Sequence, residues 1–441
     1  MPKLRPLLVL LAALALAAPG GQAAAQTVTG PTTVGRGSGL KVYLLTMGPG
    51  TEVWERFGHD ALWVHDPEHG TDWVYNYGMF DFHSPGYWGR FVKGDWIYQI
   101  GVEDIAQTMQ EYTYLNRTVT AQALNLTAAQ ALELQSYLNW NMLPGNREYL
   151  YNYYTDNCST RVRDALDMVL GGRIRAATDT VPAGTSFRWQ SRRFLAAEPV
   201  VYSFLEAGLG PPADRPISQW EEMFLPEKVA ARVAEVRVPD ARGRLVPLVS
   251  STRVLYQAVG REPIPAAPPR WIPRYLILGA AVGAVLVLLG VGAERRRFAP
   301  RFGFSLTAVL WSALAGVGGL LLIGLWAFTN HTIAYRNENL FQLSPLALPL
   351  VVLLPALAFG GRWAARPARV FALLVAFSSL LGLVLQALPW FRQVNGEIIA
   401  LALPINLALA WATLRLARSQ NTAYRSQKNG VAPASILTPD S

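Results

Sequence analysis

Cys158 is the residue with the clearest capacity for chemistry, because it is the only cysteine in the 441-residue chain. A single cysteine cannot form an intramolecular disulfide, and an unpaired thiol in an exported protein is a candidate reactive group. The thiolate is the reactive form, and the free amides and partial positive charge at a helix start stabilise it. The same amides can hold the oxyanion that forms on an attacked carbonyl.

The residues around Cys158 predict that it lies in the first turn of a helix. Asp156 and Asn157 are good helix caps, and Gly171-Gly172 is typical of a helix end. An apolar stripe follows, made of Val162, Ala165, Leu166, Val169 and Leu170. Cys158 continues this stripe toward the helix start, so we expect its thiol to face a sheet. Two roles remain open, a nucleophile and a buried core thiol, since free cysteine is often buried.

A thiol nucleophile needs a base, and a histidine oriented by a third polar group is the usual solution. The chain has five histidines. Four of them are less well placed to act as this base. They are His331 in the apolar half, His69 in a turn, His83 at a loop start and His65 at a strand end. His59 follows Arg-Phe-Gly at the beginning of a strand, and we favour it as the base.

His59 begins the first strand of a predicted antiparallel pair. Residues 59–66 alternate with period two, a turn follows, and residues 72–80 form the second strand. Another strand is expected at 39–48 and a helix at 126–143. Asn76, on the partner strand, is a candidate for the group that orients His59. A purely structural hydrogen bond is the alternative role for Asn76.

The second half of the chain predicts a membrane domain. Hydrophobic residues make up 51% of the sequence, and the excess lies in apolar runs long enough to cross a bilayer. We expect five spans, at 275–293, 304–328, 345–361, 369–389 and 397–414. Basic loops follow the first, third and fifth spans, as cytoplasmic loops should, so the carboxyl-terminal tail is expected inside.

The amino terminus resembles an export signal, with Lys3 and Arg5 before an apolar run and small residues at 23–25. The predicted domains are a signal peptide (1–25), an outside catalytic domain (26–260), a proline-rich linker (261–274), a membrane domain (275–417) and a cytoplasmic tail (418–441). Much of the net charge of +9 flanks the predicted spans, and nothing in the chain resembles a nucleic-acid-binding module.

Several segments together resemble the Lnb-type family of periplasmic domains. They are residues 47–66 (MGPGTEVWERFGHDALWVHD), 74–82 (VYNYGMFDF), 146–166 (NREYLYNYYTDNCSTRVRDAL) and 217–229 (ISQWEEMFLPEKV). Residues 330–349 and 391–410 resemble the membrane half of the same family. The resemblance, together with the order of histidine, strand pair and cysteine-bearing helix, implies an α+β fold. It would be a permuted papain-like cysteine domain followed by an α-helical five-span membrane domain.

The resemblance implies a lipoprotein N-acyltransferase of the bacterial cytoplasmic membrane, with Cys158 and His59 as its catalytic pair. The donor would be a membrane phospholipid and the acceptor the amino group of a diacylated lipoprotein, through a thioester on Cys158. No metal or organic cofactor is implied. His331, Asn337 and Asn339, on a loop expected outside, are candidates for binding a head group or the amine, with helix capping as the alternative.

Two other functions use the same residues differently. A membrane-tethered papain-like hydrolase acting on cell-wall or lipid substrates would keep Cys158 and His59, but would need one anchor and not five spans. A sensor or scaffold would leave Cys158 as a core residue. The roles of residues 173–260 are not predicted by their sequence.

Overall fold

The computed structural model describes residues 39–80 and 85–428. The predicted signal peptide and His83 lie outside these ranges. The chain divides into two compact units, which we call the sheet unit (1–202 with 215–268) and the helical unit (203–214 with 269–441). Residues 203–214 thus belong with the helical unit, although they lie within the segment that the sequence assigns to the catalytic domain.

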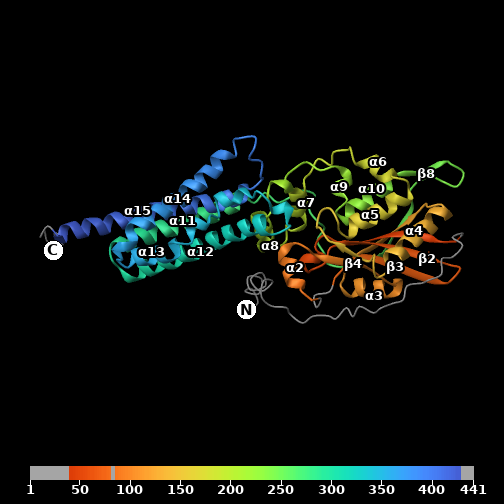
Figure 1. The fold of residues 1–441 in the computed structure, drawn as a ribbon, viewed down its shortest axis with the longest axis horizontal. Coiled ribbons are helices and arrows are strands. Elements are labelled where there is room, and N and C mark those ends of the chain that lie inside the picture. Colours follow the sequence, from red (N-terminus) through yellow and green to blue (C-terminus); the bar gives the residue numbers. More distant parts are fainter. Residues whose placement is uncertain (1–38, 81–84, 429–441) are drawn as a thin grey trace. The chain divides into compact units, whose positions relative to one another are not determined.

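The sheet unit is built on an antiparallel sheet of seven strands in the order β6-β4-β3-β2-β1-β5-β9 within the described residues (Figure 1). The strands are β1 (Lys41–Met47), β2 (His59–Asp66), β3 (Thr71–Met79), β4 (Ile97–Asp104), β5 (Val119–Leu124), β6 (Glu148–Leu150) and β9 (Val249–Tyr256). Two short strands, β7 (Arg237–Pro239) and β8 (Leu245–Pro247), pair separately. The predicted strands at 39–48, 59–66 and 72–80 are confirmed as β1, β2 and β3.

Helices cover both faces of this sheet, with α5 and α10 on one side and α3 on the other (Figure 1). The helical elements that begin in the sheet unit are η1 (Val53–Glu55), α2 (Tyr87–Lys93), α3 (Ile105–Tyr114), α4 (Ala128–Asn141), α5 (Cys158–Val169), α6 (Arg173–Thr178), α7 (Phe187–Phe194), α8 (Pro199–Gly208), α9 (Gln219–Glu222) and α10 (Pro226–Glu235). The helix expected at 126–143 is confirmed as α4, and Thr127 and Gln130 form a capping box at its start.

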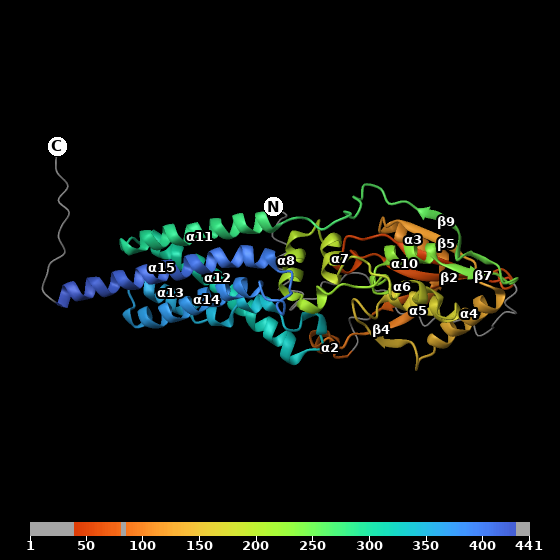
Figure 2. The ribbon, with the colours of Figure 1, turned by 90° about the horizontal axis from the view of Figure 1, so that it is seen from above.

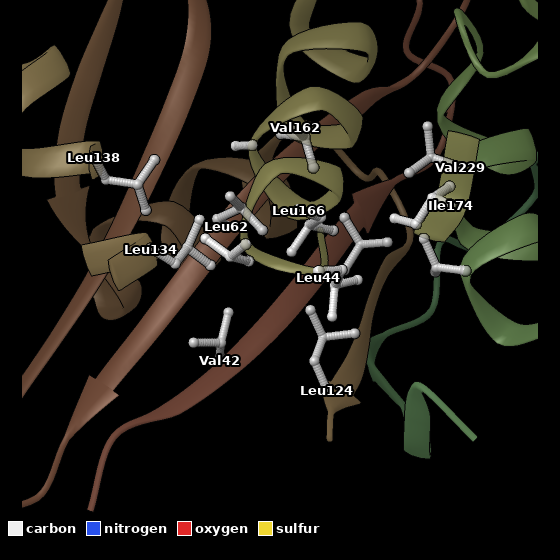
Figure 3. Close-up of a cluster of buried hydrophobic side chains, with 14 of the residues drawn as sticks. Val42, Leu44, Leu62, Leu124, Leu134, Leu138, Val162, Leu166, Ile174 and Val229 are labelled. Atoms are coloured by element: carbon white, nitrogen blue, oxygen red, sulfur yellow. The ribbon is translucent and has the colours of Figure 1, made fainter. Parts of the chain in front are cut away.

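The main core lies between the sheet and the helices α4 and α5 (Figure 3). Leu62 of β2 and Val162 and Leu166 of α5 have no exposed surface. Burying one such side chain is worth about 1.5–3 kcal/mol relative to leaving it exposed. The stripe predicted from Val162 onward is therefore the contact that fixes α5 on the sheet. A smaller core on the other face contains Ala61, Val74 and Tyr112.

The helical unit consists of long apolar helices that run side by side (Figure 2). Its elements, beyond the end of α8, are η2 (Pro211–Ala213), α11 (Ile272–Glu294), α12 (Phe298–Phe328), η3 (Thr332–Ala334), η4 (Glu338–Phe341), η5 (Pro345–Ala347), α13 (Leu350–Ala358), η6 (Arg362–Ala364), α14 (Ala365–Leu385) and α15 (Gly396–Lys428).

Four helices in the described chain are long and apolar enough to cross a membrane, and they match the first, second, fourth and fifth predicted spans. The predicted third span at 345–361 is not a continuous helix. It consists of 3-10 turns and the short helix α13, and the segments 338–347 and 350–358 meet at an angle of 53°. Prolines interrupt this stretch, because a proline ring blocks the helical hydrogen bond of the preceding turn. The unit has five spans only if this bent pair is one of them.

Close approach of α11 and α15 depends on glycine. A Cβ atom built on Gly279 would lie 2.4 Å from the backbone oxygen of Leu401, which is closer than real atoms approach. Gly283, one turn later, faces Pro404 and Ala408 in the same way. Small residues let helix backbones pack tightly where the hydrophobic effect between spans is weak.

We predict that Gly279→Ala destabilises the helical unit by about 1–3 kcal/mol, as overpacked cores do. The matched control is Gly324→Ala in α12, where an added Cβ would meet no atom within 4 Å. This control should be neutral or slightly stabilising, since alanine favours a helix over glycine by about 1 kcal/mol. Thermal unfolding of the full chain in detergent measures both. Equal effects of the two substitutions would contradict the close-packing argument.

Candidate active site

Cys158 is the first residue of α5, as its sequence context predicts. Asn157 is the cap, and its Oδ1 accepts a hydrogen bond from the Thr160 amide at 2.9 Å. The Thr160 hydroxyl in turn accepts from the Asn157 amide at 2.7 Å. This reciprocal pair satisfies amides that would otherwise lack partners at the helix start. The position of Cys158 is therefore set by the cap directly before it.

The segment 217–229, which had no predicted role, holds this helix start in place. Asn157 Nδ2 donates to the carbonyl oxygen of Phe224 at 2.8 Å. One turn into α5, Arg163 Nη1 donates to the carbonyl oxygen of Trp220 at 2.7 Å. The Arg163 guanidinium also lies over the Trp220 ring, 3.7 Å from its centroid. A segment distant in sequence thus fixes the end of α5 that carries the thiol.

The thiol lies where β2 begins and β3 ends. The backbone amides of Asp60 and Ser159 lie near enough to the sulfur to lower the pKa of the thiol. Gly78 of β3 lies next to it, and a Cβ on Gly78 would be in ordinary contact with the Cβ of Cys158 at 3.6 Å. Gly78 has a φ of +95° at a bulge of β3, a conformation that side-chain-bearing residues rarely adopt. Cys158 as a residue is half-buried.

His59 is the first residue of β2 and is held by a hydrogen-bonded chain across three strands. Its Nε2 lies 3.2 Å from Asn76 Oδ1, and Asn76 Nδ2 donates to Glu103 Oε1 at 3.0 Å. The carboxylate of Glu103 can only accept, so the amide of Asn76 must turn its oxygen toward His59. The proton of the neutral imidazole is then on Nε2, which leaves the lone pair of Nδ1 free to act as a base.

The register of β2 places His59 and Asp60 on opposite faces of the sheet. Ala61 belongs to the core on the α3 face and Leu62 to the core on the α5 face, and side chains alternate along a strand. His59 therefore shares the face of α3, while the thiol lies beside Asp60 on the face of α5. In the described structure no hydrogen bond joins Cys158 to His59, and Sγ contacts Ser159 Oγ at 3.9 Å.

Burial and the neighbouring Asp60 raise the pKa of the Cys158 thiol to about 11. The expectation that the helix start would favour a thiolate is therefore wrong for the protein without substrate. The amides of Asp60 and Ser159 do favour the charged form, but loss of solvation and a negative neighbour outweigh them. The resting thiol is protonated at neutral pH.

Asp60 is a site residue that the sequence analysis missed. It is fully buried, and burial raises the pKa of its carboxyl to about 6 even though the hydroxyls of Ser159 and Thr46 favour its charged form. Thr46 Oγ1 donates to Oδ1 at 3.0 Å, while Oδ2 is buried without a hydrogen-bond partner within the described chain. The period-two alternation of residues 59–66 was a signal for Asp60, because it puts an acid at an apolar position.

The pKa of His59 is lowered, chiefly by burial and then by the positive charge of Arg117. The Asn76 hydrogen bond and the charges of Asp60 and Glu103 act in the opposite direction. His59 is thus neutral at physiological pH, as a base must be. Arg117 is itself fixed, because its Nε donates to the carbonyl oxygen of Gly48 at 2.9 Å.

Two competing histidines have other partners. His65 Nδ1 lies 2.8 Å from Asp72 Oδ1, and His69 Nδ1 lies 2.7 Å from Asp66 Oδ2. Both are at the far end of β2 or in the turn after it, away from Cys158. No group of three or more His, Cys, Asp or Glu side chains in the ranges described could hold a metal ion.

Two of the binding candidates, Asn337 and Asn339, lie in the helical unit, and their side-chain amides are hydrogen-bonded to the backbone. Asn337 Nδ2 donates to the carbonyl oxygens of Ala207 and Gly208 at 2.8 and 2.9 Å. Asn339 Nδ2 donates to the carbonyl oxygens of Glu206 and Ala207 at 2.9 and 3.1 Å. They therefore cap the carboxyl-terminal end of α8, which is the alternative role. His331 is half-buried at the start of η3, and nothing in its surroundings indicates a substrate.

Comparison with protein families identifies the part of the chain that contains this site. Residues 36–192 match the model described as the Lnb N-terminal periplasmic domain. This segment is therefore similar to Lnb-type periplasmic domains. The match includes Cys158, His59, Asn76, Asp60 and Glu103, and it agrees with the resemblance seen in the sequence. No curated protein and no solved structure matches the chain. The match to a periplasmic domain and the four apolar helices together fit a membrane protein with a domain outside the cytoplasm.

We predict that Asp60→Asn lowers the pKa of Cys158, because it removes the negative charge beside the thiol. A thiol of pKa about 11 is ionised to roughly one part in a thousand at pH 8, so its alkylation should be slow and should speed up severalfold in the variant. The pH dependence of iodoacetamide labelling measures this, and the single cysteine makes the labelling unambiguous. Asp66→Asn, at the opposite end of β2, is the control. An equal increase in both variants would contradict the role given to Asp60.

Proposed function

We propose that this protein is a lipoprotein N-acyltransferase. It moves an acyl chain from a membrane phospholipid to Cys158, and then to the amino group of the diacylglyceryl-cysteine of a lipoprotein. The observation that carries the proposal is the chain of Glu103, Asn76 and His59, which leaves Nδ1 as a free base at the end of β2 where the thiol also lies, on the other face of the sheet. A core cysteine would need no such base.

In the first step the Cys158 sulfur attacks the ester carbonyl of the phospholipid. Because the resting thiol is protonated, its proton must leave as the S–C bond forms, and His59 Nδ1 is the group to take it. The amide of Ser159 lies at the helix start, where it can stabilise the oxyanion. The ester C–O bond then breaks, the lysophospholipid leaves with the proton from His59, and a thioester remains on Cys158.

In the second step the lipoprotein amine attacks the thioester. The new C–N bond forms, the C–S bond breaks, and His59 accepts a proton from the nitrogen. His59 returns this proton to the sulfur, so Cys158 leaves as the thiol and the cycle closes without any redox change. Asp60 fits this scheme, because its charge keeps the free thiol protonated between cycles. Cys158 and His59 lie at the same end of β2 but on opposite faces of the sheet, so the proposal requires their contact to form when substrate binds, as some catalytic contacts form only in the complex.

The architecture supports lipid substrates. Both proposed substrates are held in the membrane, and four helices of the same chain are long and apolar enough to cross it. A hydrolase that merely needs tethering to the membrane would require one such helix. The proposed reaction therefore uses a feature of the chain that the hydrolase alternative leaves without a purpose.

We predict that Cys158→Ser abolishes lipoprotein N-acylation, and that His59→Gln slows it by about 10²–10⁴-fold, the usual contribution of a general base. The matched control is His65→Gln, a second histidine on the same face of β2, which should retain activity. The assay is mass spectrometry of the amino-terminal lipopeptide after incubation of purified protein, phospholipid and a diacylated lipopeptide.

The same assay separates the alternatives. Wild-type protein should accumulate an acylated Cys158 peptide, sensitive to hydroxylamine, when the acceptor is omitted. Release of free fatty acid without any N-acylated product would indicate a hydrolase instead. Full N-acylation by Cys158→Ser would overturn the proposal, and thermal unfolding of each variant shows whether loss of activity reflects loss of fold.

A further inference from the structure

A cavity of about 620 Å³ opens in the helical unit, and no residue of the candidate active site lines it. This volume lies within the range of about 300–1,000 Å³ that is typical of ligand sites. Its walls come from the start of α11, the end of α14, the start of α15 and the connection between α14 and α15. We call it the groove. α15 packs against both α11 and α14, and the three helices run side by side (Figure 2).

The inner surface of the groove is mostly apolar. Ile272 and Leu276 line it from α11, Leu383 from α14, and Ile399 and Leu403 from α15. These helices are three of the four that are long and apolar enough to cross a membrane, and in a bilayer the groove would be surrounded by lipid. All five side chains lie near the end of the helices where α11 begins, directly after the domain outside the cytoplasm. The groove therefore opens in the outer leaflet.

One cation lies at the polar end of the groove. Arg392 is exposed, and its Nε donates to the carbonyl oxygen of Pro389 at 2.6 Å. Its two terminal nitrogens have no hydrogen-bond or ion-pair partner among the residues described here. A guanidinium presents its donors in a planar fork that matches the oxygens of a phosphate. The amides of Gln386 and Gln393 line the same end.

Hydrogen bonds to Glu338 hold the backbone and side chains at this polar end in place. Glu338 is buried and does not line the groove. Its carboxylate accepts from the backbone amide of Arg392 at 3.1 Å and from Gln386 Nε2 at 2.7 Å. Gln393 Oε1 accepts from the Glu338 amide at 2.6 Å. A buried acid in a membrane domain is costly and needs a purpose, and here it holds the backbone that presents Arg392.

We propose that the groove binds one glycerophospholipid, with an acyl chain against the apolar walls and the phosphate at Arg392. The apolar walls alone would suit any lipid, whereas the unpaired guanidinium selects one with a phosphate over a neutral diacylglycerol. A diacylated lipoprotein has no phosphate in its lipid part, so it lacks the group that Arg392 would bind. The inference goes beyond the acyltransfer reaction, because it assigns a binding site that contains neither Cys158 nor His59.

The test is native mass spectrometry of the full chain in detergent, titrated in parallel with dioleoyl phosphatidylglycerol, dioleoylglycerol and inorganic phosphate. Wild-type protein should bind the phospholipid more tightly than the other two probes. Arg392→Gln should weaken phospholipid binding about tenfold or more, as expected for loss of a charge-assisted hydrogen bond. It should leave dioleoylglycerol binding unchanged. Arg366→Gln, an exposed arginine at the other end of α14, controls for general attraction of anionic lipid and should have little effect.

A second variant tests the apolar walls. Ala400→Phe places a large side chain in the groove and should reduce binding of both lipids, and Leu403→Phe replaces it if the first variant does not fold. Equal loss of binding in Arg392→Gln and Arg366→Gln would overturn the proposal, as would unchanged binding in the groove-filling variant. Because the readout is binding, failure of the groove proposal is distinguishable from failure of the acyltransferase proposal.

Discussion

The packing of α5 against β2 and β3 is the contact on which the rest of the sheet unit depends. Leu62, Val162 and Leu166 bury their side chains completely in it, and the resulting core sets the height and direction of the helix. Since Cys158 is the first residue of α5, the same contact delivers the thiol to the end of the strands. The cap at Asn157 and the segment 217–229 then hold that end against fraying. The same packing therefore stabilises the sheet unit and positions the thiol of Cys158.

The electrostatics of the site favour neutral groups at rest. Burial disfavours charge on both Cys158 and His59. The charge of Asp60 acts in the same direction as burial on Cys158, and the charge of Arg117 does so on His59. A cysteine site with a preformed thiolate and imidazolium would be reactive before substrate arrives. Here charge must develop as the substrate is attacked, so the amides of Asp60 and Ser159 gain their full effect only at that moment.

The helical unit uses polar residues for construction. Asn337 and Asn339 satisfy carbonyl groups at the end of α8, and Glu338 holds the connection between α14 and α15. Such groups are costly in an apolar environment unless each has its partners. Arg392 differs from them, because its terminal nitrogens have no partner in the described structure. The contrast between satisfied and free polar groups is what distinguishes scaffold from candidate binding site in this unit.

The sequence by itself determined the features that depend on local pattern. These are four spans, the strands 39–48, 59–66 and 72–80, and the helix start at Cys158, because length, alternation and capping are properties of neighbouring residues. The third predicted span is a bent pair of segments and not one straight helix, because prolines break a helix in ways that depend on the packing around them. Only the tertiary structure decided that Asp60 lies beside the thiol and that Glu103 orients Asn76. It also decided that the thiol is protonated, because a pKa depends on burial and on charges that are far away in the chain.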